Sequence, residues 1–427
     1  MKRKPLSFVL LLVLIVILGS CEDRRFQTLT ANVPIYISWD ELRSSYGFDA
    51  SRPIEKPGKI YFKGQVVYIN EYLEGVHLVD ISNPGDPQKI GFINVPGNID
   101  IAIKDSVLFL DSYTDLLLVD ISDPRSPEKI KRVEDVFEYT LPEYDIDYPL
   151  ATIEEEKGVV IGWEVKRHTQ EIQQQPVIWP FYEYRMDASS LMSSVQPGGG
   201  SAYGVAGSMA RFLTHEEYLY VLDQESRLKV LEISDIDNPL IVREKHVGWG
   251  LETLFIQDAY LYIGSRQGLY ILDISDPGKP HQTSMYRHIT SCDPVVVQDN
   301  IAYVTLRSGN LCGGTENLLE IIDIQDKYNP EKITSYPMTK PYGLGVRNQL
   351  LFVCEGEHGL GIYDASDLNH IKENRIALFG EIEATDVIPM DTLLFTIGDS
   401  GFYIYDFSDA QEIFLLSKIE VDRSEPV

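Results

Sequence analysis

The chain has 427 residues, of which 44% are hydrophobic and 24% are charged. This composition is typical of a folded protein with a sizeable core, and it excludes a disordered tail or a coiled coil. With 37 basic residues against 65 acidic ones, the formal net charge is −28. Because so acidic a surface repels phosphate backbones, we expect no nucleic-acid partner.

The N-terminus has the features of an export signal. Three basic residues among the first four precede an apolar run from Leu6 to Leu18, which is too short to span a bilayer comfortably. The run leads into Leu-Gly-Ser-Cys, with the cysteine at position 21. This pattern resembles a bacterial lipoprotein signal, which implies cleavage after residue 20 and lipid on Cys21. The alternative is an ordinary secretory signal with a chance cysteine.

Two acids, Glu22 and Asp23, directly follow that cysteine. They are similar to the surface-export signal of lipoproteins in Bacteroidota-type bacteria, although two arginines come next. We therefore expect residues 21–50 to be a lipid-anchored tether at the bacterial outer membrane, facing outward. Several acyl chains on one residue give stable anchoring where a single chain does not.

The remainder of the chain repeats itself. A phrase of the form Leu-Val-Asp-Ile-Ser-Asp-Pro recurs seven times, and we use its central acid as a marker. Four of the six steps between successive markers are 40, 41, 41 and 42 residues. The markers are Asp80, Asp120, Glu232, Asp273, Asp323, Asp364 and Asp406.

Each unit contains four short runs that are rich in β-branched and aromatic residues and are separated by turn residues. A four-stranded unit of about 41 residues is the length of one β-propeller blade. In the repeated phrase, the acid and serine bond to nearby amides and proline ends the strand, so the phrase ends the third strand and turns into the fourth. The sequence therefore predicts an all-β propeller of four-stranded blades.

The repeated Leu-Val-Asp-Ile-Ser and Ile-Leu-Asp-Ile-Ser units resemble the LVIVD-repeat family of secreted and surface β-propellers. The resemblance covers about residues 33–421, and LVIVD-repeat lipoproteins of Bacteroidota share similar stretches. It implies architecture and location, and it brings no catalytic residues with it. We expect the propeller to occupy residues 51–427.

The interval between Asp120 and Glu232 is 112 residues, which is longer than two units. We expect an irregular insertion at about residues 134–208, with a hairpin formed by 149–154 and 159–165 and a mobile loop at about 186–208. Residues 33–39 are expected to lie along the propeller. The sequence favours seven blades, and the alternative is eight with a degenerate third blade.

One face of the propeller is expected to gather charged residues around the central channel. Counting 20 or 21 residues back from each marker reaches the start of the first strand, where acids recur and Gly343 stands in one blade. A ring of carboxylates favours a hard cation such as Ca²⁺, with solvated or backbone-capping acids as the alternative. The predicted ring acids are Asp100, Glu252 and Asp386, together with Asp293, which aligns once the inserted loop before its marker is allowed for.

The loops between second and third strands are expected at the same end as this ring. They add Arg266, Arg307 and His358, together with further acids. The two arginines provide another alternative, in which they neutralise the ring and leave an uncharged pocket. In either case this face is the expected ligand site, because loops on a rigid scaffold carry function.

Three cysteines besides Cys21 are expected at this end as well. In an oxidising envelope a disulfide between Cys292 and Cys312 is favoured because it pins an inserted loop, and Cys354 is then unpaired. A metal site built from these cysteines with His288 or His358 is an alternative that no Cys-x-x-Cys spacing supports.

No nucleophile elbow, zinc-binding His-Glu-x-x-His or phosphate-binding loop occurs in the sequence. We therefore expect a non-enzymatic binding platform for protein or glycan, held at the membrane through Cys21. The aromatic stretch from Trp179 to Tyr184 is a candidate for stacking on sugars. The alternative is a metal-dependent envelope hydrolase or lactonase with its site at the channel mouth.

Overall fold

A computed structural model describes residues 26–171, 205–288, 294–309 and 316–422. The described residues fall into two compact units. The smaller unit contains residues 26–39 and 141–171, and the larger unit contains the others. The short helix α2 (Trp39–Ser44) begins at the last residue of the first segment of the smaller unit.

The smaller unit is a two-stranded antiparallel sheet. Strand β1 (Phe26–Ile37) pairs along its whole length with β11 (Val159–Glu171), and a bulge interrupts the register after Ile35. The 3-10 turn η1 (Glu155–Lys157) precedes β11. Residues 33–37, which the sequence analysis expected along the propeller, are part of β1 in the smaller unit.

The expected hairpin of 149–154 with 159–165 is also wrong, because β11 has β1 as its partner. In the 149–154 segment, Leu150 makes a single parallel bridge to Asn32 of β1. The Asn32 side chain accounts for this, since its Nδ2 donates to the carbonyls of Asp145 and Tyr148 at 2.8 Å each. These bonds hold the segment as a loop beside β1.

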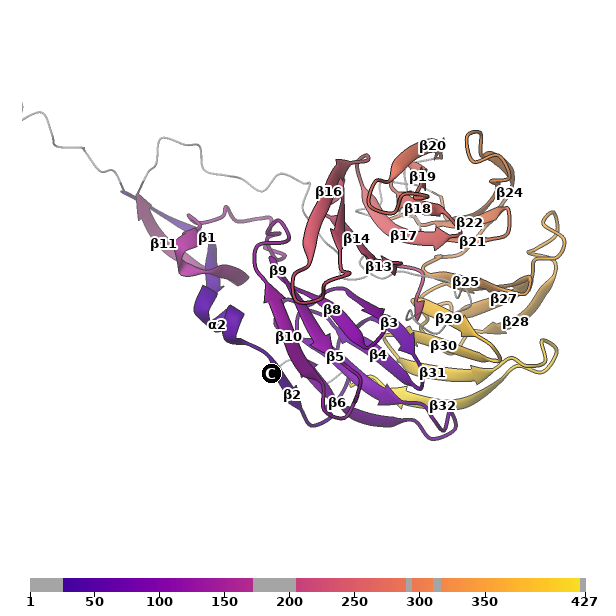
Figure 1. The fold of residues 1–427 in the computed structure, drawn as a ribbon, viewed down its shortest axis with the longest axis horizontal. Coiled ribbons are helices and arrows are strands. Elements are labelled where there is room, and N and C mark those ends of the chain that lie inside the picture. Colours follow the sequence, from indigo (N-terminus) through magenta and orange to yellow (C-terminus); the bar gives the residue numbers. More distant parts are fainter. Residues whose placement is uncertain (1–25, 172–204, 289–293, 310–315, 423–427) are drawn as a thin grey trace, which may run out of the picture. The chain divides into compact units, whose positions relative to one another are not determined.

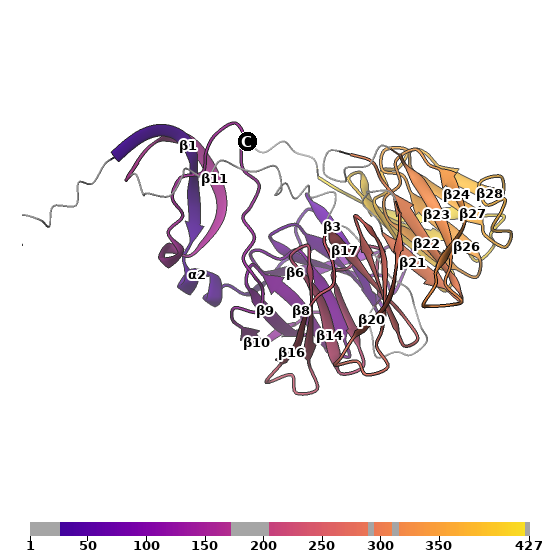
Figure 2. The same ribbon diagram turned by 90° about the horizontal axis from the view of Figure 1, so that it is seen from above.

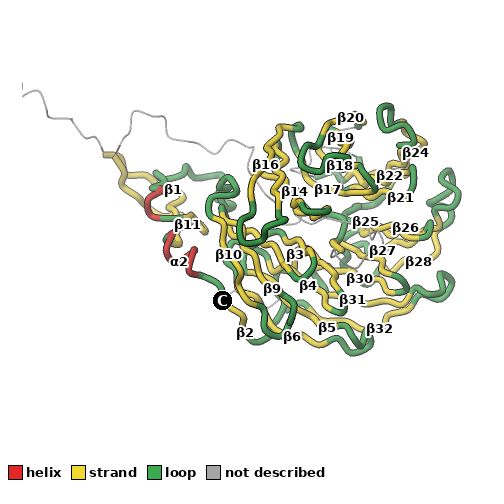
Figure 3. Tube along the Cα trace, viewed as in Figure 1, coloured by secondary structure: helices red, strands yellow, loops and turns green. Residues whose placement is uncertain are grey.

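The larger unit consists of seven antiparallel sheets that follow one another around a centre, from the indigo β3 to the yellow β32 (Figure 1). Figure 3 shows that strands and connecting loops account for nearly all of this unit. Each blade takes four strands that are consecutive in its sheet, running from the inside to the outside. Blade one consists of β3 (Pro57–Lys63), β4 (Val66–Glu71), β5 (Gly75–Asp80) and β6 (Gln88–Asn94), and blade two consists of β7 (Ile101–Lys104), β8 (Val107–Ser112), β9 (Asp115–Asp120) and β10 (Glu128–Val133). Blade three consists of β13 (Phe212–His215), β14 (Tyr218–Asp223), β15 (Arg227–Glu232) and β16 (Leu240–His246). Blade four consists of β17 (Leu251–Gln257), β18 (Tyr260–Ser265), β19 (Gly268–Asp273) and β20 (His281–Arg287).

Blades five to seven repeat the same order. Their strands are β21 (Val295–Gln298), β22 (Ile301–Leu306), β23 (Leu318–Asp323) and β24 (Glu331–Pro337); β25 (Leu344–Arg347), β26 (Leu350–Cys354), β27 (Leu360–Asp364) and β28 (Arg375–Phe379); and β29 (Asp386–Met390), β30 (Leu393–Gly398), β31 (Gly401–Asp406) and β32 (Phe414–Glu420). In the described part of the chain the predicted seven-bladed propeller is confirmed, and the eight-bladed alternative is excluded.

The first blade carries two additional strands. Strand β2 (Gly47–Asp49) pairs with the outer strand β6, and β12 (Val205–Ala206) pairs with the inner strand β3. The expectation of a mobile loop at 186–208 is wrong for residues 205–208, because these residues pair with this blade and make contacts at the centre. Residues 186–204 lie outside the described residues.

The marker acids behave as predicted, since each is the last residue of the third strand of its blade. In six blades Oδ1 of the marker aspartate accepts the main-chain N–H two residues later, with N···O distances of 2.8–3.0 Å. For Asp80, hydrogen bonds from the Ser82 side chain and main chain lower the pKa of the carboxyl. The recurrence of these acids is therefore explained by turn formation.

Neighbouring blades share their buried side chains, so the core runs continuously around the propeller. The ring closes where the last blade meets the first, and here Ile388 and Phe395 of the seventh blade pack with Ile60 and Val67 of the first. The main-chain N–H of Asp422 also donates to the carbonyl of Ile54 at 2.7 Å. Figure 2 shows the larger unit with its blades packed side by side.

Candidate functional site

The inner strands of the blades bring a set of equivalent residues together at the centre. The rule of counting back from the marker places Asp100 just before β7, Glu252 in β17, Gly343 just before β25 and Asp386 at the start of β29. The same rule reaches two basic residues that the sequence reasoning missed, Lys59 in β3 and Arg211 just before β13. We call Lys59, Asp100, Arg211, Glu252, Gly343 and Asp386 the central ring. Asp293 lies outside the described residues.

Two members of the central ring form a buried ion pair. Lys59 and Asp100, from neighbouring blades, are both 2% exposed, and Lys59 Nζ contacts Asp100 Oδ2. Asp100 also accepts the main-chain N–H groups of Arg211 and Ile101, each at 2.8 Å. Burial lowers the pKa of Lys59 against the opposing effect of Asp100. The Asp100 carboxylate is thus engaged by the protein's own donors.

A second carboxylate supports the backbone around Asp100. Asp111 Oδ1 accepts the main-chain N–H of Ile99 at 2.7 Å, that of Asp100 at 2.9 Å and Nδ2 of Asn98 at 2.7 Å. Removal from water raises the pKa of Asp111 to about 7 in spite of these bonds. Its role here is to fix the conformation just before β7.

The middle of the ring is occupied by the chain itself. Residues 205–211, which we call the central segment, enter along β3 and continue to the first strand of the third blade. Ser208, Met209 and Ala210 are at most 3% exposed. Because the segment crosses from blade to blade through buried positions, it fills the space that the sequence analysis treated as a channel mouth.

Hydrogen bonds connect the central segment to the inner strands of several blades. Gly207 N–H donates to Ile60 O at 3.0 Å, and Leu254 N–H donates to Ala210 O at 2.9 Å. Ser208 Oγ accepts the N–H of Leu344. With the bonds of Arg211 to Asp100 and of Ser208 to Asp386, the segment contacts the first, second, fourth, sixth and seventh blades.

Asp386 is the most enclosed acid of the central ring, with no exposed surface. Its Oδ1 accepts the main-chain N–H groups of Ser208 at 2.7 Å and Val387 at 3.0 Å. Among the described residues, Oδ2 has no hydrogen-bond partner. Burial raises the pKa of Asp386 to about 8. At neutral pH the raised pKa therefore favours the protonated form of Asp386.

Glycines make the close approach to Asp386 possible. A Cβ on Gly207 would lie 1.7 Å from Asp386 Oδ2, and one on Gly343 would lie 2.7 Å from Oδ1. Both distances are below any ordinary contact, so a side chain at either position displaces the acid or the segment. The sequence reasoning noted Gly343 as an exception in the acidic ring, and packing around Asp386 explains it.

The other predicted site residues are held in separate local contacts. Arg266 Nε lies 3.1 Å from Glu252 Oε1, and its Nη2 pairs with Glu225. Arg307 is buried, with its guanidinium 4.0 Å from the centroid of the Tyr342 ring.

Of the remaining predicted site residues, His358 is half exposed, and its Nε2 lies 3.8 Å from Oε1 of Glu357. The structure therefore gathers Asp100 and Asp386 around the central segment and gives Glu252, Arg307 and His358 other neighbours.

Other acids expected on the same face accept hydrogen bonds from main-chain N–H groups. Glu71 is buried, with Oε1 accepting the N–H of Glu55 at 3.2 Å and Oε2 lying 2.8 Å from Nε2 of His77. Glu355 accepts the N–H of Thr339 at 2.6 Å. The alternative of backbone-capping acids therefore describes these residues well.

The predicted cysteine pair cannot be placed, because Cys292 and Cys312 both lie outside the described residues. Cys354 is fully buried in β26, and burial raises the pKa of its thiol well above the ordinary value. Within the described ranges, no group of three or more His, Cys, Asp or Glu side chains is placed to hold a metal ion. No helix in those ranges is long and apolar enough to cross a membrane.

Comparison with protein families matches the repeats directly. The LVIVD repeat pattern fits residues 58–95, 101–135, 206–244 and 253–287, which correspond to the first four blades. The protein is an LVIVD-repeat β-propeller. The three remaining blades of this propeller share its strand order and its marker acids. The comparison with curated proteins finds no match.

The solved structures to which this chain is similar have very low sequence identity to it. The computationally designed Ika8 protein is 9% identical with a TM-score of 0.52, and the match covers 88% of this chain and 91% of that one. BamB from Moraxella catarrhalis is 10% identical with a TM-score of 0.46, over 88% and 95%. Kluyveromyces lactis Hsv2p is 10% identical with a TM-score of 0.48, over 86% and 99%. The likeness to Ika8 concerns the fold alone.

Proposed function

We propose that this LVIVD-repeat propeller is a non-enzymatic binding platform for a protein or glycan, carried at the bacterial outer membrane by lipid on Cys21. The observation that carries the proposal is the central segment, which fills the ring and engages Asp100 and Asp386. Because hydrogen bonds within the chain fill the centre, the propeller is a rigid support, and we expect ligands to bind to the exposed loops and grooves around the centre.

The same observation favours binding over the metal-dependent hydrolase. A catalytic metal needs several ligands and an open coordination position for water or substrate. Asp100 instead contacts Lys59 and two main-chain N–H groups, and Asp386 accepts two more from Ser208 and Val387. These contacts give both acids a structural role.

The membrane part of the proposal is supported by the leader sequence. A basic start, a short apolar run and Leu-Gly-Ser-Cys together match what a lipoprotein signal requires. Glu22 and Asp23 after the cysteine support an outward-facing protein. The acidic body, with a net charge of −28 for the chain, repels anionic membrane surfaces, so the lipid itself must supply the membrane affinity.

Metabolic labelling tests the anchor. The full-length chain, expressed in a Gram-negative host with an alkyne fatty acid, is expected to take up label and to sediment with the outer membrane. Cys21→Ala should lose both, whereas the matched change Cys312→Ala should lose neither. Digestion of intact cells with protease then reports the side of the membrane. Label that persists in Cys21→Ala contradicts the lipid anchor.

Two assays separate the platform from the hydrolase. Crosslinking on intact cells, together with a glycan array probed with the purified lipoprotein, is expected to identify a saturable protein or glycan ligand. Screening against ester and lactone substrates is expected to show no turnover. Turnover that a chelator suppresses and Asp100→Asn removes would establish the enzyme instead.

A further inference from the structure

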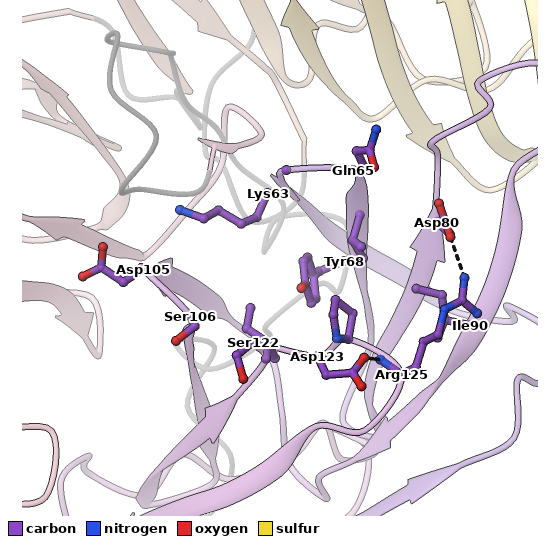
Figure 4. A pocket seen from close by; sticks show the side chains of 14 residues that line it. Lys63, Gln65, Tyr68, Asp80, Ile90, Asp105, Ser106, Ser122, Asp123 and Arg125 are labelled. Carbon is purple, nitrogen blue, oxygen red and sulfur yellow. Dashed lines mark hydrogen bonds and ion pairs between the residues drawn. The ribbon is translucent and has the colours of Figure 1, made fainter.

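A pocket of about 490 Å³ is lined by residues of the first two blades (Figure 4). Its lining includes the β3–β4 turn, which is at the other end of β3 from the central-ring residue Lys59. We call this pocket the junction pocket. It lies where the β3–β4 and β7–β8 turns meet the turn that follows the marker acid Asp120. Tyr68 stands among the lining side chains, with Asp105 on one side and Asp80 and Arg125 on the other (Figure 4). This volume is within the ~300–1,000 Å³ typical of small-molecule sites.

The junction that holds the pocket differs from the junction between the third and fourth blades. The second strand of the third blade begins with Tyr218, which packs against Gly278 in the turn of the next blade, as the 3.2 Å approach of an added Cβ shows. The second strand of the first blade begins with Val66 instead, and Arg125 takes the position of Gly278. The smaller valine leaves unfilled the space that a tyrosine ring occupies two blades later.

The same comparison identifies an unused hydrogen-bond donor. Tyr220, the third residue of β14, donates its hydroxyl to Pro277 O of the next blade at 2.7 Å. Tyr68 is the third residue of β4, and Pro124, which lines the pocket, corresponds to Pro277. Among the described residues the Tyr68 hydroxyl makes no such bond, although the side chain is 1% exposed. Tyr68 lines the pocket, and its hydroxyl is therefore available to a ligand instead of being bonded to the next blade.

The charges around the pocket oppose an anionic ligand. The carboxylates of Asp80, Asp105 and Asp123 outnumber the cations of Lys63 and Arg125. Arg125 Nη2 already lies 2.7 Å from Asp80 Oδ2, so its charge is compensated. An anion would therefore face a net negative lining.

A neutral ligand with many hydroxyl groups fits both parts of this lining. Carboxylates, Ser106, Ser122 and the Tyr68 hydroxyl offer acceptors and donors, while Val66 and Ile121 provide apolar surface for C–H faces. We propose that the junction pocket binds a short neutral oligosaccharide. This inference deepens the glycan part of the proposed function, on which it rests, by naming a site and a ligand class.

An array of neutral and uronic-acid di- to tetrasaccharides, probed with the full-length chain, provides the first test. At least one neutral saccharide should bind, and calorimetry then gives its affinity. Val66→Tyr, which copies the arrangement at Tyr218, should weaken binding at least tenfold by filling the pocket. Tyr68→Phe should weaken it about threefold to tenfold, since one hydrogen bond is lost.

Tyr220→Phe is the matched control, because it removes the equivalent hydroxyl from a junction without the pocket, and it should leave affinity unchanged. Phenylalanine is native at the third position of β8, so Tyr68→Phe keeps a side chain that this fold accepts. If Val66→Tyr fails to fold, Tyr68→Phe still decides the question. Binding only by uronic acids, no binding at all, or unchanged affinity in Tyr68→Phe would overturn the proposal.

The two proposals fail in different ways. A saccharide that binds wild type and Tyr68→Phe equally would rule out the junction pocket as its binding site, while the proposal of a binding platform would stand. A peptide or protein ligand displaced by Val66→Tyr would refute the saccharide while keeping the pocket. If no saccharide and no protein binds saturably, the proposed function as a binding platform is wrong.

Discussion

The main-chain N–H of Ser208 donates to Oδ1 of Asp386 over 2.7 Å, although 178 positions separate the two residues. This bond joins the segment that enters the third blade to the first strand of the seventh. Since both residues are fully buried, the bond forms only when distant parts of the chain are already assembled. The centre of the propeller is therefore a point at which folding and closure of the ring depend on each other.

The protonation of Asp386 should make stability depend on pH. Its pKa is raised from an ordinary 3.8 to about 8 in the folded state, so folding favours the protonated acid. The resulting stability is fully present below about pH 4 and is lost as pH rises through about 8. Asp386→Asn retains an acceptor for Ser208 and should be more stable than wild type at pH 8 by about 1–3 kcal/mol.

Denaturant unfolding of the two proteins from pH 5 to pH 9 measures this difference. Other titrating groups, Lys59 among them, act on both proteins alike and cancel in the comparison. The advantage of Asp386→Asn should grow as pH rises. A constant difference across this range would show that Asp386 does not titrate in it.

Breaking the buried ion pair of the central ring should be costly. Lys59→Ala leaves the Asp100 carboxylate buried without its cation, and we expect a loss of about 3–5 kcal/mol in unfolding free energy. Lys279→Ala removes the cation of an exposed pair with Asp276, and the expected loss is much smaller because solvent screens that pair. Equal losses in the two variants would mean that burial adds nothing to the importance of Lys59.

Gly207 should tolerate no side chain. In Gly207→Ala the new methyl group would meet Asp386 Oδ2, and we expect destabilisation of about 1–3 kcal/mol. Gly380→Ala is the matched control, because nothing lies within 4 Å of a Cβ there. Thermal unfolding of both variants gives the comparison, and a Gly207→Ala protein as stable as Gly380→Ala would contradict the close packing at the centre.

The marker acids should contribute stability through their turns. Asp364 accepts the N–H of Ser366, and hydrogen bonds from that serine lower the pKa of the carboxyl. The contribution is present above about pH 4 and is lost as pH falls through the lowered pKa. Asp364→Ala should cost about 0.5–1.5 kcal/mol at pH 7, and Asp364→Asn should cost less because it retains an acceptor. Equal losses in the two variants would show that the turn bond is unimportant.

The repeated blades could be predicted from the sequence because the turns that define them involve residues close together in the chain. Each marker acid belongs to a turn of a few residues, so its position alone identified the end of the third strand. The same spacing located Asp100 and Asp386 near the centre. Applied to every blade it also reaches Lys59 and Arg211, whose positive charges reverse the expectation of a purely acidic ring.

The smaller unit, the central segment and the junction pocket could not be predicted, because each depends on contacts between residues far apart in the sequence. Strand β1 pairs with β11 more than 100 residues away, and neither sequence specifies the other. The central segment follows a glycine-rich stretch that is typical of a loop, yet its end is buried by contacts with five blades. The junction pocket arises from the difference between Val66 and Tyr218, which has meaning only once the two strands are known to be equivalent.

Thermal unfolding with and without calcium tests the central claim most directly. If the ring acids have only a structural role, calcium should not change the melting temperature of wild type, of Asp100→Asn or of Asp386→Asn. Each protein is measured in 1 mM chelator and in about 1 mM calcium, a concentration well above the ~10⁻⁵ M range of sensor sites. A calcium-dependent rise in the melting temperature of wild type that both substitutions abolish would contradict the account and make the central ring a cation site.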